Sequence, residues 1–166
     1  YMKSPAGSML LARREEGITH IQFEEGKYVV KPKPNWRRED APLLESIDQL
    51  RAYFDGQQFR FDLPLAPIGT PFQQRVWEAL RRIPCGETRT YGEIAQAINF
   101  PTGSRAVGAA NGRNPIAIVI PCHRVIGANG KLTGYAGGLR VKKALLEHEN
   151  RMASKEGAQL ALAEGW

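Results

Sequence analysis

The residues of this chain best suited to chemistry are Cys122 and His123, which follow Pro121 at the end of an apolar run. A thiolate is a strong nucleophile, and a nearby imidazole can take the thiol proton directly or through water. Neighbouring side chains on a regular strand point to opposite faces, so these two could not share a site there. Pro121 cannot donate to a sheet ladder and favours a bend. The pattern predicts a strand over residues 118–120, then a bend that aims both side chains at one pocket.

A second interpretation of Cys122 remains open at this point, namely that it is one more small buried apolar residue. Against it, His123 and Arg124 come directly after the buried run and must reach solvent, a ligand or a partner. The other cysteine, Cys85, has no adjacent base. Two cysteines do not make a disulfide framework, so reduced thiols in an intracellular protein are expected.

The charge distribution points to an anionic partner. The 166 residues carry a formal net charge of +6, and the basic excess lies around the Cys–His stretch, where residues 101–151 hold eight Arg or Lys residues against Glu147 and Glu149. A nucleic-acid backbone would select such a distribution, although a solvated basic surface is also common. No apolar run approaches the length of a membrane span, and no leader is evident, so a cytoplasmic protein with no membrane contact is expected.

The elements that must position these residues fall into two groups. Loose alternation over residues 8–31 predicts a hairpin or meander, and helical spacing predicts a helix over residues 42–54. A short strand is expected at residues 59–61, and the Pro-rich residues 63–67 are typical of a linker. The expected organisation is therefore a mixed α/β chain with an N-terminal domain at residues 1–66 and a C-terminal domain at residues 67–166.

The C-terminal domain is predicted to be mostly helical. Thr70 with Gln73, and Thr90 with Glu93, are spaced as capping boxes at two helix starts. A Gly-containing turn then leads to a helix over residues 104–112, and together these indicate a helix-turn-helix. That last helix is mostly Gly and Ala, which favours either tight helix packing or close approach to a nucleic-acid groove. Further helices are expected at residues 139–148 and, more weakly, around residues 160–162.

Several motifs of the chain together resemble the O6-alkylguanine-DNA alkyltransferases, also called methylated-DNA–protein-cysteine methyltransferases, and most closely the short bacterial stand-alone type. The motifs are Asn114-Pro115, Ile120-Pro121-Cys122-His123-Arg124-Val125, Gly134-Tyr135-Ala136-Gly137-Gly138 and Leu145-Leu146-Glu147-His148-Glu149. The resemblance spans residues 70–149 and continues more weakly toward the N-terminus. It implies a ribonuclease-H-like fold for the N-terminal domain.

The resemblance also implies a reaction. Members of the family flip the damaged base from duplex DNA and transfer its alkyl group, from O6-methylguanine and also O4-methylthymine, irreversibly to a cysteine. Here Cys122 would be the acceptor, His123 the base acting through a water, Glu149 the carboxylate that orients it, and Asn114 part of the hydrogen-bond network. The resemblance implies substrate contacts by Tyr135, Ala136 and Val125. It implies DNA contacts by Arg105, Tyr91, Ala106, Gly108, Ala109 and Arg124, with Arg105 filling the vacated stack and Tyr91 pushing on the 3′ phosphate of the target nucleotide. A monomer without cofactor or metal is expected, cytoplasmic and, in a bacterium, nucleoid-associated.

Three other classes compete with this interpretation. Cys122 argues against a non-enzymatic damage sensor of the alkyltransferase-like kind, because those proteins lack the acceptor cysteine. The basic helix-turn-helix, and the lack of an obvious oxyanion-stabilising loop, argue against a cysteine hydrolase. A transcription factor would carry longer polar side chains on its recognition helix than residues 104–112 provide. Ala117 and Ala136 depart from the human-type pocket, which leaves tolerance for bulky alkyl groups open.

Overall fold

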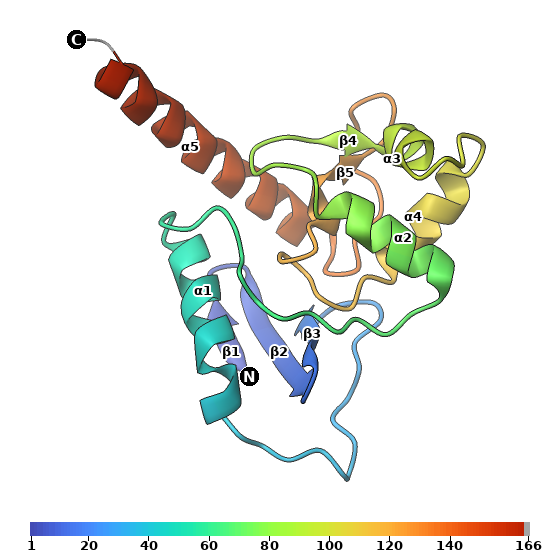
Figure 1. The fold of residues 1–166 in the computed structure, drawn as a ribbon, viewed down its shortest axis with the longest axis vertical. Coiled ribbons are helices and arrows are strands. Elements are labelled where there is room, and N and C mark those ends of the chain that lie inside the picture. The colour runs from blue at the N-terminus through green and yellow to red at the C-terminus, as the bar shows by residue number, and fades with distance from the viewer. Residues whose placement is uncertain (165–166) are drawn as a thin grey trace.

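A three-stranded antiparallel sheet opens the chain (Figure 1). Strands β1 (Met2–Ser4), β2 (Gly7–Arg14) and β3 (Gly17–Phe23) follow one another in space, and a 3-10 turn (Ala41–Leu43) leads into helix α1 (Leu44–Phe54). This computed structural model describes the backbone of residues 1–164 and the side chains of residues 1–155. The predicted meander and first helix are confirmed. The strand predicted at residues 59–61 is wrong, because that segment bends so that the Phe59 and Phe61 rings pack against the core.

The expected linker is hydrogen-bonded to the sheet. Ile18 N donates to Pro64 O at 2.8 Å, and Ala66 N donates to Ile18 O at 2.8 Å. A side chain on Gly17, whose φ is +148°, would overlap the Pro64 carbonyl, so the close approach requires glycine there. Residues 64–66 therefore continue the sheet edge and fix where the second half of the chain begins.

The second half contains the three predicted helices, α2 (Pro71–Leu80), α3 (Tyr91–Ala97) and α4 (Ser104–Gly112). Both capping boxes form: the Thr70 and Thr90 hydroxyls each accept from a backbone N–H at 3.2 Å, and Gln73 and Glu93 return a bond to the cap. The Trp77 indole donates to Ala110 O at 2.9 Å and so ties α2 to α4. The helix-turn-helix is thus fixed to a rigid support.

Residues 118–120 do not form the predicted strand. The segment at residues 116–120 starts with one parallel bridge, between Ile21 and Ile116. It then forms a turn, in which Ile120 N donates to Ile116 O at 3.0 Å. Ile118 lies at φ +72°, a conformation that costs a β-branched residue about 1–3 kcal/mol. The prediction was wrong because an apolar run is equally well buried in a turn enclosed by neighbouring elements, and periodicity does not distinguish the two.

A 3-10 turn at Cys122–Arg124 follows, and then strand β5 (Val125–Ile126), which pairs in parallel with β4 (Arg89–Thr90). The last helix, α5 (Leu139–Glu164), is longer than predicted and includes residues 160–162, whose side chains lie outside the described residues. Its buried face carries Lys142, Leu145, Glu149 and Met152. These positions recur at helical spacing, so two charged groups lie on the otherwise apolar stripe.

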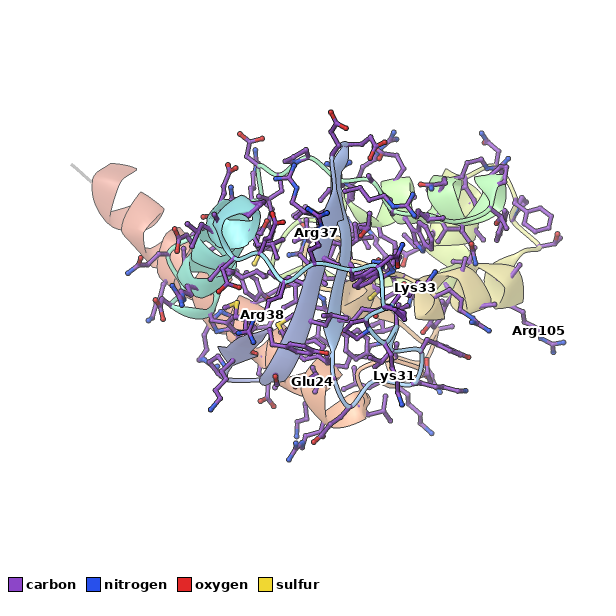
Figure 2. The ribbon with its side chains drawn as sticks, turned by 90° about the horizontal axis from the view of Figure 1, so that it is seen from below. Glu24, Lys31, Lys33, Arg37, Arg38 and Arg105 are labelled. Carbon is purple, nitrogen blue, oxygen red and sulfur yellow. The ribbon has the colours of Figure 1, made fainter. Side chains whose placement is uncertain are left out.

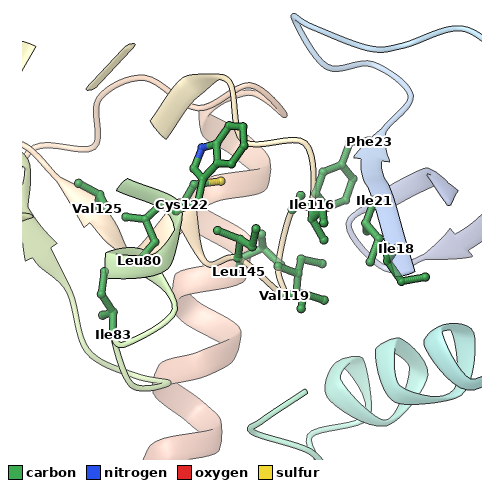
Figure 3. Packing of buried hydrophobic residues seen from close by; sticks show 14 of the residues in the cluster. Ile18, Ile21, Phe23, Leu80, Ile83, Ile116, Val119, Cys122, Val125 and Leu145 are labelled. Carbon is green, nitrogen blue, oxygen red and sulfur yellow. The ribbon is translucent and has the colours of Figure 1, made fainter. Parts of the chain in front are cut away.

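One apolar core joins the two halves of the molecule. Figure 3 shows Ile18, Ile21 and Phe23 of β3 facing Ile116 and Val119, with Cys122 and Leu145 beyond them. Because the sheet packs directly on the turn that carries Cys122, the N-terminal half supports the site from behind. Among residues 1–164 no helix is both long and apolar enough to cross a membrane.

Candidate active site

The turn that carries Cys122 is organised by the buried side chain of Asn114. Its Nδ2 lies 2.7 Å from Ile120 O and 3.0 Å from Cys122 Sγ, and its Oδ1 accepts from Ile116 N at 3.0 Å. Asn111 Nδ2 adds a contact of 3.3 Å to Cys122 O. The side-chain amides of Asn111 and Asn114 thus provide hydrogen bonds that a β-sheet would otherwise supply to this segment, and they compensate the strain at Ile118. Asn114, which the resemblance placed in the hydrogen-bond network of this turn, thus lies beside the sulfur.

Next to Cys122, His123 is fully buried and directed at Glu149. The distance from His123 Nε2 to Glu149 Oε1 is 2.7 Å. Burial lowers the pKa of His123, the charges of Arg124 and Lys142 act in the same direction, and Glu149 offsets this only in part, so the imidazole is neutral at neutral pH. A neutral ring that donates Nε2–H to a carboxylate has its lone pair on Nδ1. Within the described residues Nδ1 has no hydrogen-bond partner, so the ring can accept a proton there.

Glu149 is the centre of a buried polar cluster. Its Oε1 accepts from the Tyr53 hydroxyl at 2.8 Å and from Arg124 Nη2 at 2.9 Å, and its Oε2 accepts from Arg124 Nε at 2.8 Å. Burial acts to raise the pKa of Glu149, but its electrostatic and hydrogen-bond interactions with His123 and Arg124 outweigh it and hold that pKa well below its usual range. The carboxylate is ionised, and its negative charge is available to stabilise an imidazolium.

Arg124 corrects the sequence prediction. It was expected among the DNA contacts, but its side chain is buried, forks onto Glu149 and donates through Nη1 to Ile83 O at 2.5 Å. A bidentate pair of this kind uses the planar guanidinium fully. Arg124 therefore neutralises the buried carboxylate and presents no free cation to DNA.

The thiol itself is kept protonated by its surroundings. Cys122 is 4% exposed, and burial raises its pKa to about 11, although the Asn114 amide and the Lys142 charge act in the opposite direction. A thiol with such a pKa needs a base to become a nucleophile at neutral pH. The neutral His123 beside it in sequence meets that requirement chemically.

A narrow cavity of about 30 Å³ leads to Cys122, and both halves of the chain line it. Asn114, Ala117, Tyr135, Ala136 and Gly137 contribute one side, and residues from β3 and the following loop contribute the other. One ordered water needs about 10–15 Å³ of such space, so the cavity has room for about two water molecules beside Cys122. Tyr135 and Ala136, two predicted substrate contacts, lie at this cavity. Val125, the third, is buried in β5 and is not part of the lining.

A buried lysine holds the Gly-rich loop beside this cavity. Lys142 is fully buried, and its Nζ donates to Val125 O at 2.5 Å and to Thr133 O at 2.8 Å. The same Thr133 carbonyl accepts from the Tyr91 hydroxyl at 3.1 Å. Burial lowers the pKa of Lys142 to about 8. Tyr91, a predicted DNA contact, is thus connected to the loop that carries Tyr135.

The outer face of α4 is exposed and small. Arg105, Ala106 and Ala109 are exposed and Gly108 is half-buried, while Val107 and Ala110 face the core. Figure 2 shows the Arg105 side chain projecting clear of the body of the molecule. Gly108 lies against the Tyr91 ring, so α3 and α4 meet closely at this point. The four α4 residues predicted to contact DNA therefore all lie on, or at the border of, the exposed side of the helix.

Tyr53 and Lys142 are site residues that sequence reasoning missed. Tyr53 was assigned only to the apolar face of its helix, and nothing in the local pattern marks its hydroxyl as a partner of Glu149, 96 residues away. Lys142 did leave a signal, because it lies seven residues before Glu149 on the same helical stripe. A charged residue at such a position predicts a buried polar contact. Among the described residues no group of three or more His, Cys, Asp or Glu side chains is arranged to hold a metal ion.

Comparison with known proteins gives consistent results over nearly the whole chain. Residues 1–67 match the family model of the 6-O-methylguanine DNA methyltransferase ribonuclease-like domain, and residues 71–151 match that of the DNA binding domain of the same family. A methylated-DNA–protein-cysteine methyltransferase of Methanosarcina acetivorans is 56% identical over 147 residues, which cover 89% of this chain and 94% of the relative. The protein of that name from Mycobacterium tuberculosis is 51% identical over 150 residues, 90% of each chain.

Solved structures agree with these relatives. The crystal structure of Mycobacterium tuberculosis OGT in complex with DNA superposes with a TM-score of 0.85 at 50% identity and covers 91% of each chain. The O6-methylguanine-DNA methyltransferase of Pyrococcus kodakaraensis matches with a TM-score of 0.54 at 27% identity, covering 85% of this chain and 97% of that one.

Proposed function

The chain belongs to the 6-O-methylguanine DNA methyltransferase family, and from that premise we propose that it repairs DNA by moving the alkyl group of O6-methylguanine, and of O4-methylthymine, onto the sulfur of Cys122. It is a methylated-DNA–protein-cysteine methyltransferase whose partner is duplex DNA. Two buried groups of contacts carry the assignment to Cys122: an amide lies on its sulfur, and the neutral imidazole of the next residue lies on a carboxylate held ionised by an arginine.

The proposed chemistry is a nucleophilic substitution at the alkyl carbon. His123 Nδ1 takes the Cys122 proton through a water molecule, and Glu149 stabilises the imidazolium that forms. The sulfur–carbon bond forms as the carbon–O6 bond breaks, and the guanine ring takes up, through water, the proton that His123 removed from the thiol, so that neutral guanine leaves and His123 is neutral again. Asn114 keeps Sγ in place during this exchange. Because a thioether is the end point and no group in the cluster can cleave it, each chain reacts once.

DNA recognition is assigned to the exposed side of α4. The small residues Ala106, Gly108 and Ala109 let the helix lie deep in the minor groove, while Arg105 fills the stack that the flipped base vacates. Tyr91 is assigned to the phosphate of the target nucleotide. Base flipping is required because O6 lies on the major-groove edge of the paired base, whereas α4 is assigned to the minor groove and Cys122 is buried.

Tyr135 and Ala136 are proposed to hold the flipped base, with Val125 contributing only through its backbone. We retain the division into domains at residues 1–66 and 67–166. A monomer that needs no cofactor is proposed, located in the cytoplasm and, in a bacterium, at the nucleoid.

The test uses duplex DNA that contains one O6-methylguanine. Wild type is expected to remove one methyl group per chain, and Cys122→Ala none, while Cys122→Ala binds the duplex with nearly unchanged affinity because α4 is intact. Cys85→Ser is the matched control, since it removes the other thiol, and it is expected to repair at the wild-type rate. Repair by Cys122→Ala, or several turnovers per chain, would contradict the proposal.

A further inference from the structure

The wall of the Cys122 cavity that faces Tyr135 comes from the N-terminal half of the chain. Gln22 and Phe23 of β3 contribute to it, and so do Gly26, Tyr28 and Val29 of the following loop. Tyr28 is 37% exposed, so its ring lies at the rim, between solvent and the cavity. A large side chain at the mouth of a narrow cavity limits what can enter.

Arg113 holds this ring from the opposite half of the molecule. Its guanidinium carbon lies 3.9 Å from the centre of the Tyr28 ring, well within the range of a cation–π contact. Lys27 Nζ lies further away, at 5.3 Å. Arg113 is exposed and is the C-cap residue of α4, the helix assigned to DNA. One side chain therefore connects the end of the DNA-facing helix to the rim of the cavity.

The backbone around Tyr28 is also joined to the substrate loop. Lys27 N donates to Ala136 O at 2.7 Å, and Gly26 and Gly137 pack so closely on Ala136 and Phe23 that an added Cβ would crowd them. Figure 1 shows the connection after β3 running beside the C-terminal half before it returns to α1. The wall of the cavity is thus held together by contacts between two segments more than a hundred residues apart.

From these contacts we propose that Tyr28, held by Arg113, is the gate of the Cys122 cavity and determines which alkyl groups reach the thiol. The inference rests on the proposed function for its substrate and extends it to a specificity-determining residue in the N-terminal half. When α4 binds DNA, Arg113 moves with the helix end, the ring is released, and the flipped base enters. Without DNA the gate stays closed and protects the thiol from small electrophiles.

A purely structural role for the pair would look different. Arg113 at the C-terminus of α4 also stabilises that helix electrostatically. If that were its whole role, removing it would loosen α4 and leave Tyr28 in place. The two roles differ in whether the effects of changing Arg113 and Tyr28 depend on each other.

The experiment labels the free protein with iodoacetamide and measures the rate at each cysteine by peptide mass. Tyr28→Ala and Arg113→Gln are each expected to label Cys122 about threefold to tenfold faster than wild type, as loss of a cation–π contact of ordinary strength predicts. The double variant is expected to be no faster than Tyr28→Ala, because Arg113 acts through the ring. Lys31→Gln is the control: it removes one positive charge from the loop that carries Tyr28 and is expected to label Cys122 at the wild-type rate. The labelling rate at Cys85 is expected to stay unchanged in all variants.

A second readout addresses specificity. In duplex DNA, Tyr28→Ala is expected to raise the repair rate of O6-benzylguanine relative to O6-methylguanine by a similar factor. Unchanged labelling of Cys122 in both single variants would overturn the gate. Independent, multiplying effects of the two changes, or a parallel rise at Cys85, would also overturn it in favour of general loosening. Because labelling needs no alkyl transfer, a wild type that takes no methyl group from DNA would defeat the proposed function while leaving the gate measurable.

Discussion

Glu149 and Arg105 are both charged, but the protein surrounds them in opposite ways. Glu149 is fully buried and accepts hydrogen bonds from Tyr53 of α1 and from His123 and Arg124 of the 3-10 turn. Arg105 projects into solvent from a helix of small residues (Figure 2). The charge of Glu149 is therefore held in place before substrate binds, whereas the charge of Arg105 stays in solvent until the protein binds DNA. The cluster around Glu149 should therefore matter to stability and chemistry together, and α4 to duplex DNA alone.

The sharpest test of this difference is Glu149→Gln. Removing one partner of a buried ion pair typically costs about 3–5 kcal/mol, because the other charge stays buried without compensation. At neutral pH the variant is expected to unfold at much lower denaturant concentration than wild type and to transfer methyl groups far more slowly.

The pH dependence of that loss has a definite sign. The pKa of Glu149 is depressed in the folded protein, so its contribution is present above the unfolded-state value of about 4.5 and disappears as pH falls toward the folded value. The gap in unfolding free energy between wild type and Glu149→Gln should therefore narrow in acid. A gap that stays constant down to the lowest accessible pH would contradict the ionised buried carboxylate.

Arg105→Ala should behave in the opposite way. Stability should barely change, but repair in duplex DNA should slow about tenfold to a hundredfold, because base flipping costs a few kcal/mol and the vacated stack is no longer filled. Reaction with free O6-benzylguanine should not change, once wild type is shown to react with it. Arg105→Lys should rescue only partly, since lysine lacks the planar guanidinium. Equal losses on both substrates would assign Arg105 to the fold instead.

Methylation of Cys122 is expected to have a smaller effect on stability. Cys122 is 4% exposed, with an amide 3.0 Å from its sulfur, so an added methyl group crowds a packed site. Overpacking of this kind costs about 1–3 kcal/mol, and a lower melting temperature after repair is expected in calorimetry. An unchanged or higher melting temperature would count against strain at Cys122.

Tyr53→Phe should have the smallest effect on stability and repair, and it shows how much the Tyr53 hydroxyl contributes to the Glu149 cluster. It removes one hydroxyl donor but leaves His123 and Arg124 on the carboxylate. A loss of about 1–2 kcal/mol in unfolding free energy is expected, with repair slowed only slightly. A loss as large as that of Glu149→Gln would mean that Tyr53, and not Arg124, is the main support of the carboxylate.

The two regions also differ in how well the sequence predicts them. The bounds of α4 and both capping boxes follow from local spacing, since each depends on residues within a few positions of one another. The turn at residues 118–120 and the burial of Arg124 do not. The turn depends on Asn114 and on the sheet behind it, and Arg124 depends on Glu149, 25 residues later. Contacts across such separations leave no periodic signal in the sequence. For this reason Arg124 was predicted to contact DNA, although it belongs to the buried cluster around Glu149.

The most direct test of the account is the mass of the protein after one reaction. Wild type is mixed with an excess of duplex DNA containing O6-methylguanine, digested, and mapped by peptide mass. We predict one added methyl group, on the peptide that contains Cys122. The peptide that contains Cys85 should be unchanged, and the DNA should contain unmodified guanine. A methyl group on any other residue, or guanine restored with no added mass on the protein, would contradict it.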